Sequence, residues 1–361
     1  MNILVLNAGS SSLKFAVFAA ETLAPVLRGQ ISGIGSTPRL EVSGEETVAA
    51  TSVSSLPEAQ YFAVRWLAKH GAASDSFSGI GHRIVHGGTK YVSPIRVDDA
   101  IQHELEALRG LAPLHLPFGL DALREMRKLA PRVPHVACFD TAFHATQPEW
   151  ATRLPIPREY HARGYRRYGF HGLNYEHVVA SLPRPPPRRL LAAHLGSGAS
   201  MCAIENGRSI ATTMGFSTAD GLVMGTRTGT IDPGVLIALM RDEHLDIEGL
   251  EDLLYRRSGL LGLSGISSDM RVLLASDRPE AKEAVDYYCY SAARHAGSLV
   301  AALGGLDAIV FTGGIGENAA PVRQRILDHL KWLGLRDDAI YIVPANEELA
   351  IARHVKALLA L

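Results

Sequence analysis

The chain has few cysteines, no excess of charge of either sign and no long apolar run, and each absence removes a class of protein. Its 361 residues contain three cysteines, Cys138, Cys202 and Cys289, which lie far apart, so neither a disulfide framework nor a cysteine-rich metal site is expected. The 36 basic and 37 acidic residues nearly cancel and are interspersed, so no basic face for nucleic acid is expected.

The N-terminus lacks the basic and apolar regions of a secretory leader, and no apolar stretch reaches the roughly 18 residues of a membrane helix. We therefore expect a cytoplasmic protein that binds neither nucleic acid nor a membrane. At this length the chain can bury a large core and is expected to form two domains.

What the chain does contain is one hairpin pattern that occurs twice. An apolar run at residues 3–6 enters a turn of small residues at 8–12 and leaves as a second apolar run, and residues 191–193 with the turn at 196–200 repeat this order. Turns with little side chain let backbone N–H groups approach an anion. One copy would indicate only an ordinary tight turn, but two copies favour a nucleotide held between similar halves, as in an ATP-dependent phosphotransferase.

Strand and helix patterns alternate along the rest of the chain, which predicts an α/β fold. The proline-rich segment at 184–189 is predicted to be a surface connection before the second hairpin. Helices are predicted at 56–70, 100–111, 119–129, 232–244, 279–303, 317–332 and from 346, and strands at 133–139, 308–312 and 340–343.

Short motifs in family order, spread over nearly the whole chain, resemble the acetate kinase family. They are LVLNAGSSSLKF (4–15), GHRIVHGG (81–88), LAPLH (111–115), FDTAFH (139–144), YGFHG (168–172), MGTRTGTIDP (224–233), SGISSDMR (264–271), GGIGEN (313–318) and NEELAIAR (346–353). The resemblance implies the acetate and sugar kinase, Hsp70 and actin fold, which is ribonuclease H-like, with the active site in a cleft between two similar domains. Those domains would be residues 1–140 plus 347–361, and residues 141–346.

The resemblance also implies the reaction ATP + acetate ⇌ ADP + acetyl phosphate, with Mg²⁺ (or Mn²⁺) and a homodimer. Independently of it, a carboxylate acceptor titrates near pH 4 and is already ionised at neutral pH, so it needs no general base. Phosphoryl transfer needs positioning and neutralisation of the phosphoryl oxygens instead. Arg83 and Arg227, both in glycine-flanked segments, suit that task because guanidinium groups are permanently charged and bidentate.

The remaining catalytic and acid-binding residues follow from the resemblance. Asp140 matches the family's essential aspartate, and we assign it to orienting the arginines or metal-bound water. His171 would act in the transition state and His115 on the substrate. The acid would also contact Arg83 and the side chains of Val85, Leu114, Phe170 and Thr218. Thr218 stands where acetate kinases commonly have proline, so the pocket could admit propionate, because one methylene discriminates by only about 1–3 kcal/mol.

The nucleotide and the metal are assigned in the same way. The metal positions of the family match Asn7 and Glu347, which offer the hard oxygen ligands that Mg²⁺ prefers. The first phosphate hairpin would contribute Ser10, Ser12 and Lys14. The other nucleotide-binding residues would be His194, Leu195, Gly196, Ser197, Gly198, Asp269, Met270, Arg271, Gly314, Ile315, Gly316, Glu317 and Asn318.

Two alternatives from other classes stay open at this point. Residues 314–319 fit the relaxed dinucleotide fingerprint G-x-G-x-x-A between a predicted strand and helix, as in an NAD-dependent dehydrogenase, but one fingerprint is weak evidence and leaves the paired hairpins unexplained. A nucleotide-binding, non-catalytic relative is suggested by departures from the family pattern: Ser197 replaces the usual Asn, Leu116 follows His115, and Leu173, Asn174 and Tyr175 replace the usual Thr-Ser-His.

Overall fold

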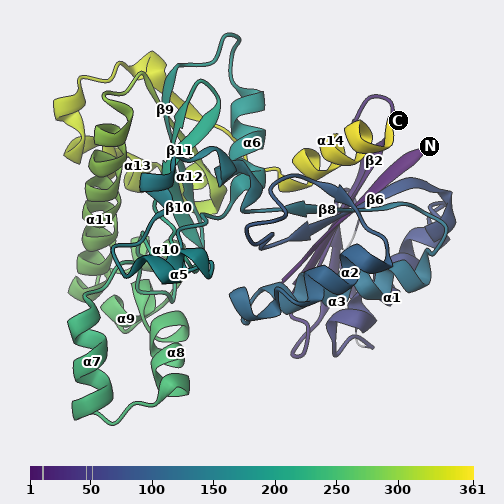
Figure 1. Ribbon diagram of the computed structural model, residues 1–361, viewed down its shortest axis with the longest axis horizontal. Coiled ribbons are helices and arrows are strands. Elements are labelled where there is room, and N and C mark those ends of the chain that lie inside the picture. Colours follow the sequence, from purple (N-terminus) through teal and green to yellow (C-terminus); the bar gives the residue numbers. More distant parts are fainter. Residues whose placement is uncertain (10–11, 46, 51) are drawn as a thin grey trace. The chain divides into compact units, whose positions relative to one another are not determined.

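The computed structural model describes residues 1–361 except 10–11, 46 and 51, and at residue 74 it describes the backbone alone. The chain divides into two compact units (Figure 1). Unit 1 is Met1–Ala142 together with Asn346–Leu361, and unit 2 is Phe143–Ala345. Each unit contains a mixed β-sheet and helices, which confirms the predicted α/β class.

Unit 1 is built on a sheet with the strand order β5-β4-β3-β2-β1-β6-β8-β7. Strands β1 and β2 form an antiparallel hairpin, whereas β1, β6 and β8 run parallel. The strands are β1 (Asn2–Ala8), β2 (Ser12–Ala19), β3 (Pro25–Ser32), β4 (Arg39–Val42), β5 (Val48–Ala49), β6 (Phe77–Ile84), β7 (Ile95–Arg96) and β8 (His135–Phe139).

Helices cover both faces of this sheet (Figure 1). Because side chains alternate along a strand, Leu4, Leu6 and Ile80 face α1 (Leu56–Lys69) and α3 (Leu116–Leu129) in one core. On the other face, α14 (Glu347–Leu359) packs so closely on β6 that a Cβ at Gly81 would lie 2.4 Å from Ile351. Unit 1 also contains η1 (Ser74–Ser76), α2 (Asp99–Glu106) and η2 (Arg109–Leu111).

Unit 2 is built on a sheet with the order β11-β10-β9-β12-β13. The hairpin β9–β10 is antiparallel, and β9, β12 and β13 run parallel. The order and directions match β3-β2-β1-β6-β8 of unit 1, so the hairpin seen twice in the sequence belongs to a repeated five-strand arrangement. The strands are β9 (Arg189–Leu195), β10 (Ala199–Glu205), β11 (Arg208–Thr212), β12 (Ala308–Thr312) and β13 (Ile340–Ile342).

The long helix α11 (Pro279–Leu303) packs on β10 and on α13, and buries an alanine-rich face. The helices α7 (Pro233–Asp242) and α8 (Ile247–Arg256) project together from the unit (Figure 1). The others are η3 (Ala142–Thr146), α4 (Glu149–Thr152), α5 (Arg158–Ala162), α6 (Gly172–Ser181), α9 (Gly259–Ser264), α10 (Met270–Leu274), α12 (Gly313–Asn318), α13 (Ala320–His329), η4 (Lys331–Leu333) and η5 (Asp337–Ala339).

Two predicted helices were wrong in their extent. The helix expected at 317–332 is two helices that break at Ala319, because Pro321 in the first turn of α13 disfavours continuing the preceding turn, and α12 begins at Gly313. The helix expected at 100–111 is α2 followed by η2. In the part of the chain that the structure describes, no helix is both long enough and apolar enough to cross a membrane.

Candidate active site

The strands of unit 1 bring three predicted residues to one edge of the sheet. Asn7 lies near the end of β1, Arg83 near the end of β6, and Asp140 directly after β8. These strands are parallel neighbours, so their carboxyl ends meet at the same edge, which is where open α/β sheets bind ligands. Arg83, Asp140, Asn7 and Glu347, which we call the arginine cluster, were predicted from four separate motifs.

Arg83 is the centre of the arginine cluster. Its Nε donates to Oδ1 of Asp140 at 3.1 Å, its NH2 group pairs with the other carboxylate oxygen, and its NH1 group donates to Oδ1 of Asn7 at 3.2 Å. Burial opposes the charge, but the carboxylates of Asp140, Glu347 and Glu348 outweigh that effect and raise the pKa of Arg83. The side chain of Asp140 is 1% exposed, so this carboxylate is held as a fixed partner of the guanidinium.

The start of α14 completes the cluster. Asn346 caps this helix by accepting a hydrogen bond from the Leu349 backbone N–H at 3.2 Å. The next two residues point their carboxylates at β1, where Asn7 Nδ2 donates to Glu347 at 3.0 Å and to Glu348 at 3.4 Å. Glu347 is also 3.3 Å from Nε of Arg83. Sequence reasoning missed Glu348, although its place beside Glu347 in the first turn was the available signal.

The predicted acid-binding residues of unit 1 lie near this edge. The helix α3 approaches β6 so closely that a Cβ at Gly119 would lie 2.9 Å from the carbonyl oxygen of Arg83. His115 is the N-cap residue of that helix, one turn before Gly119, and Leu114 precedes it. Val85 is buried just after β6. Close packing of α3 therefore places these residues at the same end of β6 as the guanidinium.

The first hairpin was predicted to contribute Ser10, Ser12 and Lys14 to the phosphate site. Lys14 pairs with Asn7 in the β1–β2 register and is exposed, and the backbone N–H of Gly9 donates to the carbonyl of Ser12 at 2.8 Å. Ser10 lies outside the described residues. A hollow of about 420 Å³ beside this hairpin is lined by Lys14, Arg28 and Glu348, so it reaches the acidic start of α14.

In unit 2 the predicted residues gather around the turn between β9 and β10. A Cβ at Gly198 would lie 3.5 Å from Nε2 of His171 and 3.6 Å from NH1 of Arg227. The rings of His171 and His194 stack at 4.1 Å with an angle of 16° between their planes. We call His171, His194, Arg227 and this turn the histidine cluster.

Two hydrogen bonds fix the flanks of the histidine cluster. NH1 of Arg227 donates to the carbonyl of Thr218 at 3.1 Å, and Nε2 of His144 is 2.9 Å from the carbonyl of Phe170, the residue before His171. Thr218 and Phe170 are themselves buried. Burial lowers the pKa of His144 to about 4, so at neutral pH this ring is uncharged and donates from Nε2.

The three predicted nucleotide-binding segments meet at the same turn. The backbone N–H of Gly225 donates to the carbonyl of Ser197 at 3.1 Å, and a Cβ at Gly225 would lie 3.2 Å from the carbonyl of Ser268, next to Asp269. A Cβ at Gly196 would lie 4.0 Å from the backbone nitrogen of Gly314. Glycine at 196, 198 and 225 therefore leaves the space around the turn open.

Some members of these segments have structural partners. Asp269 caps α10 and pairs with Arg271 at 2.6 Å on the surface, and Glu317 accepts a hydrogen bond from the Ala345 backbone at 2.8 Å. Residues 314–316, which were predicted to lie between a strand and a helix, lie inside α12, because α12 starts directly after β12 at Gly313, whose φ is +79°.

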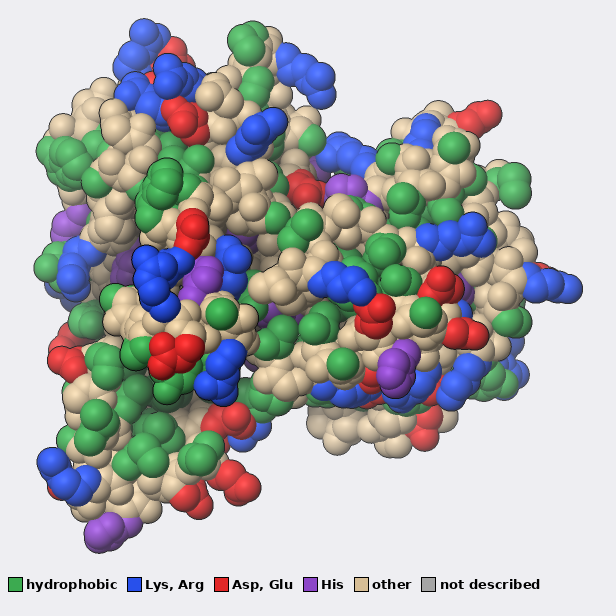
Figure 2. Space-filling model, in the orientation of Figure 1, with side chains coloured by type: hydrophobic (Ala, Val, Ile, Leu, Met, Phe, Trp, Pro, Cys, Tyr) green, Lys and Arg blue, Asp and Glu red, His purple; other side chains and the backbone are tan. Residues whose placement is uncertain are grey.

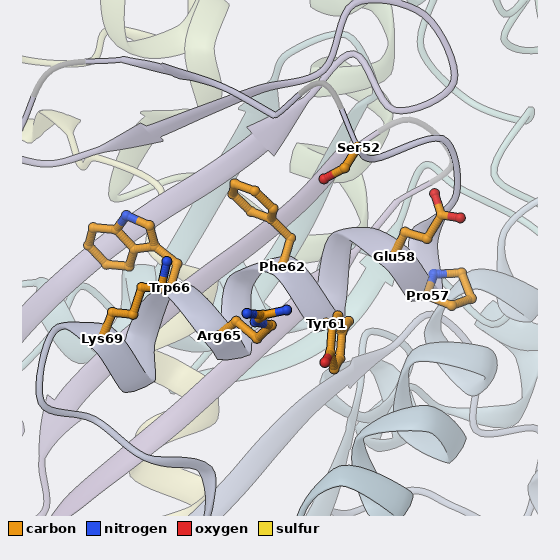
Figure 3. Close-up of a pocket in the computed structure, with 8 residues that line it drawn as sticks. All are labelled: Ser52, Pro57, Glu58, Tyr61, Phe62, Arg65, Trp66 and Lys69. Atoms are coloured by element: carbon orange, nitrogen blue, oxygen red, sulfur yellow. The ribbon is translucent and has the colours of Figure 1, made fainter.

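A larger hollow lies elsewhere in unit 1. About 610 Å³ in volume, it follows α1 and is lined by aromatic and basic side chains that include Tyr61, Phe62, Arg65 and Trp66 (Figure 3). Its lining is distinct from the predicted site residues.

Comparison with known proteins agrees with this fold. The family model and the curated relatives show a kinase with a carboxylate acceptor. The chain belongs to the acetokinase family, which it matches over residues 2–352.

The chain is 47% identical over 390 residues to the acetate kinase of Nitrobacter hamburgensis, covering 99% of this chain and 96% of the relative, and 44% identical over 387 residues to that of Rhodopseudomonas palustris, covering 98% and 97%. Among solved structures, the acetate kinase of Porphyromonas gingivalis matches with a TM-score of 0.89 and 31% identity, and a propionate kinase from Francisella tularensis with 0.91 and 32%. Each structural match covers 99% of both chains.

These findings confirm the predicted family, fold class and enzyme class. They favour neither the propionate-preferring kinase nor the non-catalytic relative, and the dehydrogenase gains no support from them.

Proposed function

We propose that this enzyme catalyses ATP + acetate ⇌ ADP + acetyl phosphate by direct in-line transfer, and that the arginine cluster and the histidine cluster serve the same reaction. The observation that carries the proposal is the convergence of Nε2 of His171 and NH1 of Arg227 on the Gly198 turn. Hydrogen-bond donors that converge on a side-chain-free turn suit the three equatorial oxygens of a phosphoryl group in transfer.

The arginine cluster is proposed to bind the acceptor. An acetate ion needs a fixed cation and no base, and Arg83 supplies the cation while Asp140 holds its guanidinium plane. Because Asp140 is buried and paired, we assign it to orienting Arg83 and not to removing a proton. His115, Val85, Leu114, Phe170 and Thr218 are proposed to surround the acid, with Thr218 held through its carbonyl by Arg227.

The histidine cluster is proposed to bind the phosphates of ATP. The turn at 196–198 has glycine on both sides of Ser197, which lets a phosphate approach the backbone, and Arg227 and His171 place donors beside it. Ser12 and Lys14 of the first hairpin, and the segments 194–198, 269–271 and 314–318, are proposed to hold the rest of the nucleotide.

The residues at the start of α14 fit Mg²⁺. Asn7, Glu347 and Glu348 offer amide and carboxylate oxygens within one hydrogen-bonded group, and hard oxygen ligands are those that Mg²⁺ prefers. Among the described residues no three His, Cys, Asp or Glu side chains are grouped to hold a metal alone, so water and phosphate would supply further ligands. When bound, Mg²⁺ would neutralise charge on the phosphates.

We further propose a homodimer in the cytoplasm. The homodimer is supported by α7 and α8, in which every side chain is exposed or only half-buried although both helices are rich in leucine, isoleucine and valine. Exposed apolar patches of this kind mark interaction surfaces.

The test is to trap acyl phosphate with hydroxylamine in the presence of ATP, Mg²⁺ and acetate, propionate or butyrate. We expect hydroxamate with acetate, and a loss of at least 100-fold in rate for Arg227→Ala, because the variant removes a charged donor from the transition state. Arg336→Ala, which removes a surface arginine paired with Asp338, is the control and should keep full activity. Absence of hydroxamate with every acid, or near-normal turnover by Arg227→Ala, would contradict the proposal.

A further inference from the structure

A chain of buried hydrogen bonds runs behind the histidine cluster. Nδ1 of His171 is 2.8 Å from Oγ of Ser200, and the same oxygen is 2.5 Å from the phenol oxygen of Tyr175. Ser200 and Tyr175 are both 0% exposed. Ser200 also lies opposite His194 in the register of β10 and β9, and the ring of His194 stacks on His171.

The protons of this chain can be placed from its ends. The phenol proton needs an acceptor in a site closed to water, and Oγ of Ser200 lies 2.5 Å away, so Tyr175 donates to Ser200. Burial raises the pKa of Tyr175 well above its usual value, so the phenol keeps that proton. Ser200 then accepts from Tyr175 and gives its hydroxyl proton to His171. Nδ1 of His171 is therefore an acceptor, and in the neutral ring the proton lies on Nε2.

We infer that Tyr175 is a positioning residue that acts through Ser200 to hold His171 as the neutral tautomer with its proton on Nε2, facing the Gly198 turn beside Arg227. In this tautomer the ring presents a donor where a Cβ of Gly198 would lie 3.5 Å away. The inference rests on the proposed role of His171 at the phosphoryl group. If Nε2 lacked its proton, its lone pair would face a phosphoryl oxygen, and two acceptors cannot form a hydrogen bond.

The opposite arrangement of protons is disfavoured by the same contacts. If His171 donated from Nδ1, Ser200 would donate to Tyr175, and the phenol proton would then lack an acceptor in a site closed to water. A charged His171 would also add a second positive charge beside Arg227, because both side chains reach the Gly198 turn.

The tyrosine of this hydrogen-bond chain is one of the departures from the family pattern. Tyr175 stands where acetate kinases usually have the histidine of Thr-Ser-His. Its position at the start of α6 brings the phenol to Ser200 on β10, so the substitution supplies a donor of fixed direction.

The experiment compares Tyr175→Phe and Ser200→Ala with Tyr288→Phe in the full-length protein. Tyr288 is the matched control, because it is a buried tyrosine of α11 whose hydroxyl lacks a hydrogen-bond partner among the described residues. Nitrogen-15 NMR of histidine-labelled protein reports the tautomer directly. We expect the wild type and Tyr288→Phe to show His171 protonated on Nε2, and the other two variants to show a mixture of tautomers.

In the hydroxamate assay, we expect Tyr175→Phe and Ser200→Ala to lower kcat by about 10–100-fold, the usual effect of losing a partner that orients a functional histidine, and to leave KM for ATP within about twofold. An unchanged His171 spectrum in both variants, or a changed spectrum with full kcat, would overturn the inference. Having two variants protects the test against one that fails to fold. A wild type without acyl phosphate would contradict the proposed function instead, and the spectra would still decide the tautomer.

Discussion

Arg83 is held by partners that come from three distant parts of the chain, and its geometry depends on a planar fork of donors. Nε and NH2 meet the two oxygens of Asp140 while NH1 meets Asn7. Three donors in one plane, each with its own acceptor, fix the direction of the positive charge. The charge alone would not fix it, because an ammonium group has no such plane.

We therefore predict that Arg83→Lys loses most of the activity although the charge is kept. The lysine cannot serve Asp140 and Asn7 together, and a buried carboxylate is left with fewer hydrogen bonds. The rate of hydroxamate formation at low acetate should fall by about 100-fold, roughly 3 kcal/mol of transition-state binding. Arg336→Lys, on the surface, should match the wild type. If Arg83→Lys did the same, the planar fork would have no role.

At the scale of elements, His144 joins three of them. It lies in η3, its Nδ1 is 2.9 Å from Oγ of Ser209 on β11, and its Nε2 is 2.9 Å from the carbonyl of Phe170 just before α6. Burial lowers its pKa to about 4, whereas an unfolded histidine titrates near 6.5. Between these pH values the histidine is protonated in the unfolded chain but not in the folded chain. The contribution of His144 to the free energy of unfolding is therefore fully present above about pH 6.5 and is lost as the pH falls toward 4.

We predict that unit 2 loosens around His144 in mild acid. Between about pH 7 and about pH 5 this residue alone should remove about 2 kcal/mol from the free energy of opening, seen as faster hydrogen exchange in β11 and the start of α6 after correction for intrinsic rates. His144→Gln can make the same two hydrogen bonds and does not titrate. Its pH dependence in those peptides should be smaller by that amount, and equal pH dependence would refute the assignment.

The elements that could be predicted from sequence are those that end at strong local signals. The helix at 279–303 and the strand at 308–312 were confirmed to the residue, because Pro279 opens the helix and Gly304 closes it with a φ of +66°. Both hairpins were confirmed for the same reason. The start of α12 at Gly313 was missed, since glycines are poor helix formers and only the packing of α12 on β9 and β12 makes them helical.

The site residues were harder to predict, because their partners are remote in sequence. The roles predicted for Arg83, Asp140 and Glu347 came from family motifs, and no local pattern announces that they meet Asn7. Ser200 and Tyr175 were missed as partners of His171. A buried phenol that points at a serine depends on the contact between α6 and β10, which neither segment shows alone.

For the whole molecule, the proposed homodimer rests on α7 and α8. Val235, Ile237, Met240 and Ile247 are all exposed, Ile247 at 78%, and apolar side chains gather over these helices (Figure 2). Burying apolar surface stabilises by about 25 cal/mol per Å², so an isolated chain would leave this gain unused.

We predict that the wild type has the mass of a dimer in light scattering, and that Ile237→Glu combined with Ile247→Glu gives a folded monomer, because two buried carboxylates would have to be desolvated at the interface. Val26→Glu, at a position in unit 1 that is 60% exposed, should leave the mass unchanged. A wild-type mass of one chain would dismiss the homodimer, and an unchanged mass in the double variant would move the interface elsewhere.

The return of α14 to unit 1 has a consequence for how the protein is made. The hydrogen bond between Asn7 and Glu347 joins residues 340 positions apart, and the glycines of β6 lie bare until α14 covers them. On a ribosome, β1, β6 and β8 emerge early, yet they wait for the whole of unit 2 to be translated before their second face is closed and the guanidinium of Arg83 gains its last carboxylate. A chain that ends before α14 therefore has a complete second unit but an incomplete first unit. Activity is then expected only from chains whose translation has continued past α14.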